Sequence, residues 1–269
     1  MAADAGVVVV TGAGGAGCGR SISACFAACG AAVVVSDIDE AGARETVRAI
    51  EAAGGRAALC LADVRDDASV RELMAFAERT FGALQVLVNN ASATHVAGDA
   101  IEGWTDPLET DLLGAIRCAR WAIDVMRRGG GGAIVNIASI SALWHGRRTS
   151  GGFAGYDVAK AGMIRMTTRL AALAATDNIR VNCLAPGWIA TGGALAYWES
   201  LTAAEREARG VPAQLISPDR IAEAVERLAT DRSLSGRIVV WWSDDGPQLV
   251  DWGDRGYRRA EPFALTSRS

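Results

Sequence analysis

The chain has 269 residues, 50% of them apolar, which is enough for one large α/β domain with a substantial core. Its formal net charge of −4 is spread without blocks of like charge, which gives no indication of a nucleic-acid partner. The longest apolar runs fall well short of the roughly 20 residues of a membrane helix, and the early run at 7–10 lacks the flanks of a signal peptide. We therefore expect a soluble cytoplasmic protein with neither membrane nor nucleic-acid partners.

Short β-branched runs alternate along the chain with longer stretches that carry the apolar spacing of helices, for example residues 69–81. The first six runs are apolar almost throughout, as in parallel strands that are buried on both faces. This alternation predicts an α/β fold, a doubly wound parallel sheet with helices on both faces, in a single domain over residues 1–269. The expected strands are residues 7–12, 31–37, 57–64, 84–91, 132–139, 179–187 and 236–242.

The six cysteines form no CxxC pair, and the chain has only two histidines. These numbers argue against a zinc centre, so no metal site is predicted. Reduced, buried thiols are the expected state of the cysteines.

A glycine-rich segment, "TGAGGAGCGR" at 11–20, joins the first expected strand to the first helix. Glycines such as Gly12 and Gly19 allow a tight turn and a close approach of a pyrophosphate. The N-terminus of the following helix offers free N–H groups and the positive end of its dipole. The segment therefore indicates a dinucleotide site at the carboxyl edge of the sheet, where such sheets bind ligands.

Asp37 ends the second expected strand. An acid at this place can accept hydrogen bonds from the ribose hydroxyls of adenosine, and it repels a 2′-phosphate. No Lys or Arg lies in the glycine segment before Arg20, so NAD is the expected cofactor rather than NADP. Asp63, after the third strand, could reach the adenine in the same way. The alternative role is a helix cap or turn acid for Asp37 and a helix cap for Asp63.

The motif "YDVAK" at 156–160 places Lys160, the only lysine of the chain, one helical turn after Tyr156. A neighbouring ammonium favours the phenolate, so we expect the pKa of Tyr156 to lie below its ordinary value of about 10. The tyrosine could then exchange a proton with an alcohol or a carbonyl near neutral pH. The alternative is an ordinary amphipathic pair with a surface lysine. Replacing Lys160 by arginine is expected to leave stability almost unchanged, because no core volume is removed.

Five segments of the chain resemble the motifs of the short-chain dehydrogenase/reductase family in order and approximate spacing. They are "TGAGGAGCG" (11–19), "NNAS" (89–92), "IVNIAS" (134–139), "YDVAK" (156–160) and "APGWIAT" (185–191). The resemblance spans roughly residues 6–246 and implies a Rossmann-like catalytic domain with NAD(P)-dependent oxidoreduction. Residues 247–269 would be a C-terminal extension.

The resemblance also implies roles for single residues. Tyr156 would be the general acid and base, Lys160 would bind the nicotinamide ribose, and Ser139 would hydrogen-bond the substrate oxygen. Asp111 occupies the position of a catalytic residue of the family. Together with the reasoning from the strand ends, the expected cofactor-binding residues are Gly12, Cys18, Gly19, Asp37, Asp63, Val64, Asn90, Tyr156, Lys160, Ile189 and Thr191.

Four features depart from the family pattern. The glycine segment is one residue longer than usual, and Ser92 stands where the family usually has glycine. Asp111 stands where the family usually has asparagine, and its negative charge would oppose a Tyr156 phenolate. An insert at 144–155 lengthens the interval between Ser139 and Tyr156.

The residues expected around the substrate are aromatic. In the family the region at 188–212 forms a lid, so Trp188 and Trp198 could line an apolar pocket together with Trp144 and Phe153 of the insert. Packing in the core or at a subunit contact is the alternative for each of them. The tail at 243–259 would cover the site or bind a neighbouring subunit.

These observations predict an NAD(H)-dependent oxidoreductase that interconverts a secondary alcohol and a ketone, on a hydrophobic cyclic or aromatic substrate. A 3-oxoacyl-thioester reductase and a non-catalytic dinucleotide-binding sensor or scaffold are the alternatives. The resemblance also implies association through the helices at 111–127 and 156–175 and through the last strand. The apolar surface of residues 110–126 suits a helix packed on two sides, so we expect a homodimer or homotetramer.

Overall fold

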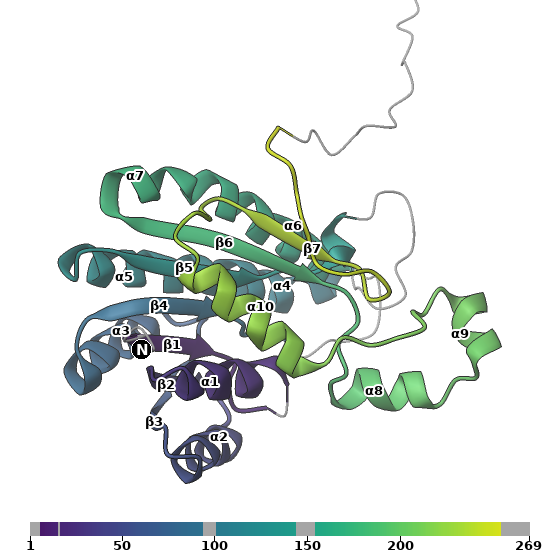
Figure 1. The fold of residues 1–269 in the computed structure, drawn as a ribbon, viewed down its shortest axis with the longest axis horizontal. Helices are drawn as coiled ribbons and strands as arrows, with labels where there is room; N and C mark the ends of the chain where they lie inside the picture. The colour runs from purple at the N-terminus through teal and green to yellow at the C-terminus, as the bar shows by residue number, and fades with distance from the viewer. Residues whose placement is uncertain (1–5, 16, 94–100, 144–153, 254–269) are drawn as a thin grey trace, which may run out of the picture.

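The computed structural model describes residues 6–15, 17–93, 101–143 and 154–253. Within them the strands form one sheet in the order β3-β2-β1-β4-β5-β6-β7-β8 (Figure 1). Strands β1 to β7 are parallel to their neighbours, and β8 runs antiparallel to β7. The strands are β1 (Val7–Thr11), β2 (Ala32–Asp37), β3 (Arg56–Leu61), β4 (Leu84–Asn89), β5 (Gly132–Ile137), β6 (Ile179–Pro186), β7 (Ile238–Trp241) and β8 (Gln248–Leu249). The predicted doubly wound sheet is confirmed.

Two strands differ from the sequence-based expectation. β3 lies at one edge of the sheet, so its residues are half-buried or exposed rather than buried on both faces. β8 was not predicted, because a two-residue strand has no periodicity to detect. It covers the edge of β7, which is therefore not the last strand of the sheet.

The helices cover both faces of the sheet (Figure 1). Side chains alternate along each strand, so Val8 and Val10 of β1 join one core cluster and Val7 and Val9 join another. The first cluster includes residues of α1 (Cys18–Ala28), α2 (Glu40–Ala52) and α10 (Pro218–Thr230). The second includes residues of α3 (Asp67–Phe81) and α5 (Gly114–Arg128).

Helix α6 (Ala154–Arg169) packs beside β5 and β6 in a third, smaller cluster. The shorter helical segments are η1 (Ile101–Trp104), α4 (Thr105–Pro107), the π-helical turn η2 (Leu108–Leu113), η3 (Ile140–Leu143), η4 (Leu170–Ala172), α7 (Leu173–Asp177), α8 (Gly192–Glu199) and α9 (Ala203–Arg209). None of the described helices is both long and apolar enough to span a membrane.

Local signals in the sequence explain where several helices begin. The Asp39 side chain caps α2 by accepting from Ala41 N, and the Asp66 side chain caps α3 by accepting from Ala68 N. The six cysteines are free thiols, and only Cys118 and Cys183 are fully buried, so the expectation of buried thiols holds for two of them.

Candidate active site

A cavity of about 740 Å³ lies at the carboxyl ends of the parallel strands. It sits where β1 is flanked by β2 on one side and β4 on the other, the place at which such sheets bind nucleotides. The structure places all the expected cofactor-binding residues in its wall: Gly12, Cys18, Gly19, Asp37, Asp63, Val64, Asn90, Tyr156, Lys160, Ile189 and Thr191. Ser139 lines the same cavity.

The glycine segment is compact because its glycines approach other backbone atoms closely. Gly12 has φ of 65°, and a Cβ built on it would lie 2.6 Å from Cα of Ala91. A Cβ on Gly19 would lie 2.3 Å from the carbonyl oxygen of Gly12. Helix α1 then begins at Cys18 without a side-chain cap on its first turn. Larger residues at these two positions would force the segment away from β4 and α1.

Asp37 is held at the end of β2 by two backbone N–H groups. Gly14 N donates to its Oδ2 at 2.7 Å, and Asp39 N donates to its Oδ1 at 2.9 Å. The cap of α2 is Asp39, so Asp37 is not a helix cap, but the bond that it accepts from Asp39 N is that of a turn acid. Arg20, the first basic residue after the glycines, pairs with Glu45 at 3.0 Å. The cavity wall at the end of β2 therefore presents the Asp37 carboxylate.

Asp63 is engaged by a neighbouring arginine. Its Oδ2 lies 2.7 Å from Nη2 of Arg65, and hydrogen bonding to Arg65 holds the pKa of Asp63 below its usual range. The cap of α3 is Asp66, so the capping alternative for Asp63 is wrong. Arg65 lines the cavity as well, although nothing in the sequence singles it out.

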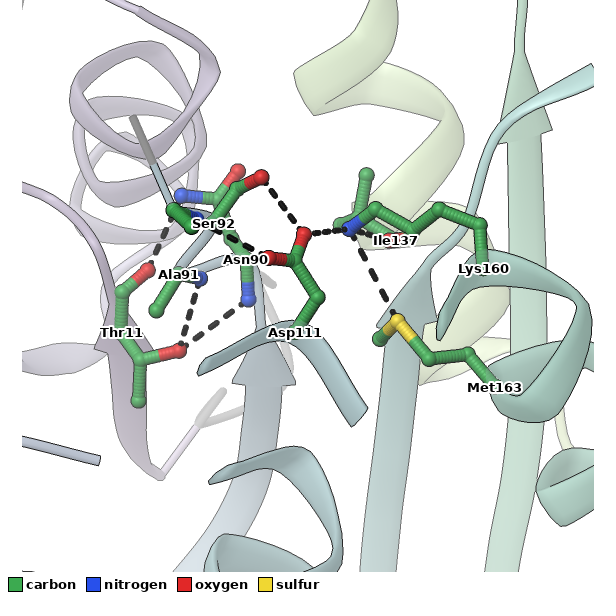
Figure 2. A network of polar contacts seen from close by, with 9 residues as sticks. Thr11, Asn90, Ala91, Ser92, Asp111, Ile137, Lys160 and Met163 are labelled. Atoms are coloured by element: carbon green, nitrogen blue, oxygen red, sulfur yellow. Dashed lines mark hydrogen bonds and ion pairs between the residues drawn. The ribbon is translucent and has the colours of Figure 1, made fainter. Parts of the chain in front are cut away.

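Asn90 joins the ends of β1 and β4 (Figure 2). Its Nδ2 donates to the carbonyl oxygens of Thr11 and Gly12, both at 2.9 Å. The Thr11 hydroxyl oxygen accepts from the backbone N–H groups of Asn90 and Ala91, both at 3.1 Å. These bonds fix the end of β4 against the start of the glycine segment.

Lys160 is buried rather than on the surface, with its side chain 3% exposed. Its Nζ lies 2.9 Å from Oδ1 of Asp111 and donates to the carbonyl oxygen of Ile137 at 3.0 Å (Figure 2). The sulfur of Met163 lies 3.7 Å from the same Nζ, which is also 5.2 Å from the centre of the Tyr156 ring. The single lysine therefore has a defined place at the end of the cavity, next to the tyrosine.

The pKa of Tyr156 is raised, whereas the sequence led us to expect a lowered value. Loss of hydration is the largest cause, and it outweighs the Lys160 ammonium, which lowers the pKa. The Asp111 carboxylate raises the pKa further, which agrees with the expected opposition of its charge to the phenolate. A hydrogen bond with the Ser139 side chain acts in the lowering direction. The i, i+4 spacing identifies the neighbouring charge but not how far the ring is removed from water.

Asp111 lies in the π-helical turn η2, and its side chain is fully buried. Ser92 Oγ donates to its Oδ1 at 2.6 Å, and Ala93 N donates to its Oδ2 at 2.9 Å. The two residues that depart from the family pattern, Ser92 and Asp111, are thus in direct contact. A single π-helical turn inside a helical segment is frequent at functional sites, and it aims this carboxylate at Lys160.

The aromatic residues expected around the substrate do not line the cavity where the structure describes them. The indole ring of Trp188 stacks on Tyr197, with the ring centres 6.1 Å apart. Trp198 Nε1 donates to the carbonyl oxygen of Pro212 at 2.9 Å, and the Arg206 guanidinium lies 3.8 Å from its ring centre. Both tryptophans therefore stabilise the segment that carries α8 and α9, which projects from the sheet in Figure 1. Trp144 and Phe153 lie outside the described residues.

The two ends of the α8–α9 segment are tied together. Ile216 N donates to the carbonyl oxygen of Trp188 at 2.9 Å, and Ala190 N donates to the carbonyl oxygen of Ile216 at 2.8 Å. Trp188 N also donates to Ser243 Oγ at 2.7 Å.

The described part of the tail lies beside β7 and not over the site. Its residues form β8, and the Arg237 guanidinium lies 5.2 Å from the ring centre of Trp252. No tail residue up to 253 lines the cavity, so the expectation that this part covers the site is wrong.

Asp106 and Thr110 are cavity residues that the sequence did not reveal. They precede Asp111 by less than two helical turns. Their position in the sequence next to an expected catalytic residue is the feature that could have identified them.

Comparison with known proteins agrees with this geometry. Residues 12–241 match a family model described as Enoyl-(Acyl carrier protein) reductase. The chain is 38% identical over 230 residues to cis-4-hydroxycyclohexanecarboxylate dehydrogenase of Sinomonas cyclohexanicum, covering 84% of this chain and 89% of the relative. It is 36% identical over 255 residues to 3beta-hydroxysteroid dehydrogenase 1 of Eggerthella lenta, covering 90% and 93%.

A crystal structure described as a short-chain dehydrogenase/reductase of Burkholderia xenovorans has the same fold, with a TM-score of 0.80. It is 34% identical in sequence, and the match covers 90% of this chain and 97% of that one. On these grounds the chain belongs to the short-chain dehydrogenase/reductase family of oxidoreductases, which use a nicotinamide dinucleotide, NAD or NADP.

Proposed function

We propose that the protein is an NAD(H)-dependent dehydrogenase that interconverts a secondary alcohol and its ketone on a hydrophobic cyclic or aromatic substrate. The observation that carries this proposal is the grouping of Ser139, Tyr156 and Lys160 in the wall of a cavity whose other end holds Asp37. Two relatives are named as dehydrogenases of a ring alcohol, one on a cyclohexane and one on a steroid, which supports a cyclic substrate.

The bound dinucleotide supplies or accepts the hydride in this chemistry. The residues of the chain move and hold the proton. The Ser139 side chain shares a hydrogen bond with Tyr156, so the two hydroxyls are close enough to bind one substrate oxygen together. Tyr156 accepts the alcohol proton during oxidation and returns it during reduction. The ammonium of Lys160 stabilises the phenolate that forms.

Initial rates of NADH formation with a panel of cyclic and aromatic secondary alcohols test the proposal. We expect turnover with at least one ring alcohol, and its loss in Tyr156→Phe, which removes only the hydroxyl. Dinucleotide binding without turnover in either direction would favour the sensor or scaffold instead.

A 3-oxoacyl-thioester reductase is the second candidate, because the matching family model is described by an acyl-carrier substrate. The same panel should include a 3-oxoacyl thioester with NADPH. Preference for that pair would replace the ring-alcohol proposal.

The first quantitative expectation concerns the preference of the enzyme for NAD over NADP. NAD should be preferred over NADP, because a 2′-phosphate would meet the Asp37 carboxylate and Arg20 is occupied by Glu45. Asp37→Asn keeps the shape and removes the charge, so it should narrow the preference by about tenfold. The ratio of kcat/KM for the two cofactors measures this.

The control for this substitution is Glu40→Ala, which removes the same charge from the exposed start of α2. It should leave the cofactor ratio unchanged. A native preference for NADP would show that Asp37 does not face the 2′ position.

Self-association is the second expectation, and we propose a homodimer or homotetramer. Leu113 of η2, Ile116 of α5 and Val158 of α6 are 37%, 41% and 44% exposed, on elements that pack against one another. Such an apolar face is typical of an interface. Since β8 covers the edge of β7, we expect association through these helices rather than through the last parallel strand.

Light scattering at micromolar concentration should give at least twice the monomer mass. Ile116→Glu should lower the mass to that of the monomer. Ala52→Glu adds the same charge to exposed α2 and should not change it. A monomeric wild-type protein would contradict the proposal.

A further inference from the structure

The buried carboxylate of Asp111 faces three hydrogen-bond donors from two separate segments, the end of β4 and helix α6. Ser92 Oγ and Lys160 Nζ both approach Oδ1, at 2.6 and 2.9 Å, and Ala93 N approaches Oδ2 at 2.9 Å. Figure 2 shows Ser92 and Lys160 pointing at the same carboxylate, Ser92 from the end of β4 and Lys160 from α6. An ionised carboxylate is an acceptor at both oxygens and satisfies the whole set.

A neutral side chain of the same shape does not satisfy this set of donors. An amide has one acceptor oxygen and one NH₂ group, which would face either the N–H of Ala93 or the ammonium of Lys160. A protonated acid carries a hydrogen that only the Ser92 hydroxyl could accept, and that hydroxyl would then no longer donate to Asp111. The donor set therefore favours the carboxylate form of Asp111, and Ser92 supplies one of the hydrogen bonds to it.

An ionised Asp111 balances the charge of Lys160, so the ammonium acts on Tyr156 as half of a neutral pair. The other titratable groups around Tyr156 and Lys160 do not restore a net positive charge. Asp157 of α6 opposes the phenolate, and burial raises the pKa of the Cys183 thiol on β6 to about 12, which keeps it neutral. Glu109 of η2 is paired with Arg117 of α5 at 3.0 Å.

We propose that Asp111, positioned by Ser92, balances the charge of Lys160 and so sets the pH range in which Tyr156 takes the proton of the alcohol. In this assignment Ser92 is a positioning residue that acts through Asp111. The proposal rests on the function proposed above, since it takes Tyr156 as the proton acceptor. It also gives one reason for two departures from the family pattern, because Ser92 and Asp111 complement each other.

The pH dependence of kcat/KM for alcohol oxidation tests the proposal in four proteins: wild type, Asp111→Asn, Ser92→Ala and the double variant. Asp111→Asn leaves the Lys160 ammonium unbalanced, so the acidic limb of the profile should move to lower pH by about one unit. Its plateau should fall, because the amide fits the donors poorly. Ser92→Ala leaves the carboxylate charge less compensated and should move the limb to higher pH by a smaller amount.

The double variant separates positioning from a purely structural role. If Ser92 acts through Asp111, Ser92→Ala should shift the limb in the wild-type background and not in the Asp111→Asn background. A structural role for either residue would lower the plateau without moving the limb, and that result would overturn the proposal. Ser92 is exposed, so its replacement removes no core contact and remains informative even if Asp111→Asn folds poorly.

A second readout does not depend on the substrate. Ultraviolet titration of the phenolate in each protein, with the matching Tyr156→Phe variant subtracted, gives the ionisation of Tyr156 directly and cancels Tyr197 and Tyr257. The titration should shift to lower pH in Asp111→Asn. If it shifts while no alcohol is oxidised, the proposed function fails, and only the part of the inference that couples the Asp111 charge to the ionisation of Tyr156 stands. If alcohol is oxidised while neither the titration nor the limb moves, the inference fails and the function stands.

Discussion

Replacing Lys160 by arginine should lower the turnover number for alcohol oxidation by about 10²–10⁴-fold, the range of general acid–base assistance. Nζ occupies a closed site formed by Asp111, the Ile137 carbonyl and Met163, and the side chain is 3% exposed. A planar guanidinium is wider than an ammonium and cannot occupy that site in the same geometry. The substitution should also weaken NADH binding, which a purely acid–base role would leave unchanged.

Steady-state kinetics and a fluorescence titration with NADH measure the two effects of Lys160→Arg. Arg165→Lys makes the reverse exchange on the exposed side of the same helix and should change neither. Turnover at the wild-type rate would contradict the role assigned to Lys160. The sequence led us to expect almost no change in stability, but burial of the side chain makes overpacking unavoidable. We now expect a loss of about 1–3 kcal/mol in the free energy of unfolding.

Replacing Lys160 by methionine should cost about 3–5 kcal/mol of the free energy of unfolding, because it leaves the Asp111 carboxylate buried without its partner. Methionine keeps most of the volume of the lysine stem, so the loss reflects charge rather than a cavity. The double variant Lys160→Met/Asp111→Asn removes both charges and should recover a large part of the loss. Urea unfolding of the cofactor-free proteins at neutral pH measures all three values.

Arg79→Met is the control, since it breaks an ion pair with Glu72 in which both side chains are more than half exposed. It should cost no more than about 1 kcal/mol. If Lys160→Met and Arg79→Met lowered the free energy of unfolding by the same amount, the prediction would be contradicted.

The stability that Lys160 contributes also has a defined pH dependence. Burial acts to lower the pKa of Lys160, but the charges of Tyr156 and Asp111 and the hydrogen bond to Asp111 outweigh it, so the pKa is raised. The contribution is therefore complete below the ordinary lysine pKa of about 10.4 and is lost as the pH rises through the higher value of the folded protein. The difference between wild type and Lys160→Met should be constant around neutral pH and should shrink only in strongly alkaline solution.

The cofactor end of the cavity was predictable because its residues are placed by local rules. Gly12 and Gly19 lie in a strand-to-helix turn, and Asp37 ends the neighbouring strand, so parallel pairing brings them to one edge. Tyr156 and Lys160 share a helix face for an equally local reason. In each case the chain positions are close in sequence or linked by the regular order of strands.

Other features of the site depend on contacts that no local pattern encodes. Ser92 and Asp111 are 19 positions apart, and they meet only because the end of β4 faces the π-helical turn. The raised pKa of Tyr156 depends on its removal from water by the folded chain. Trp198 is an aromatic residue in the expected region, but Arg206 and Pro212 hold its ring within the α8–α9 segment.

The closed neck of the α8–α9 segment makes the geometry of the cavity independent of the length of that segment. Backbone hydrogen bonds join its two ends, Trp188 and Ala190 at one end and Ile216 at the other. The Ser243 hydroxyl, just after β7, accepts from Trp188 N and so fixes the first end to the sheet. Because the ends meet whatever lies between them, residues can be inserted, deleted or exchanged there at a small cost in loop entropy. The cavity wall at Pro186 and Gly187 would keep its position through such changes. Evolution, or a graft from a relative, can therefore change the α8–α9 segment without displacing Tyr156 and Lys160 at the cavity.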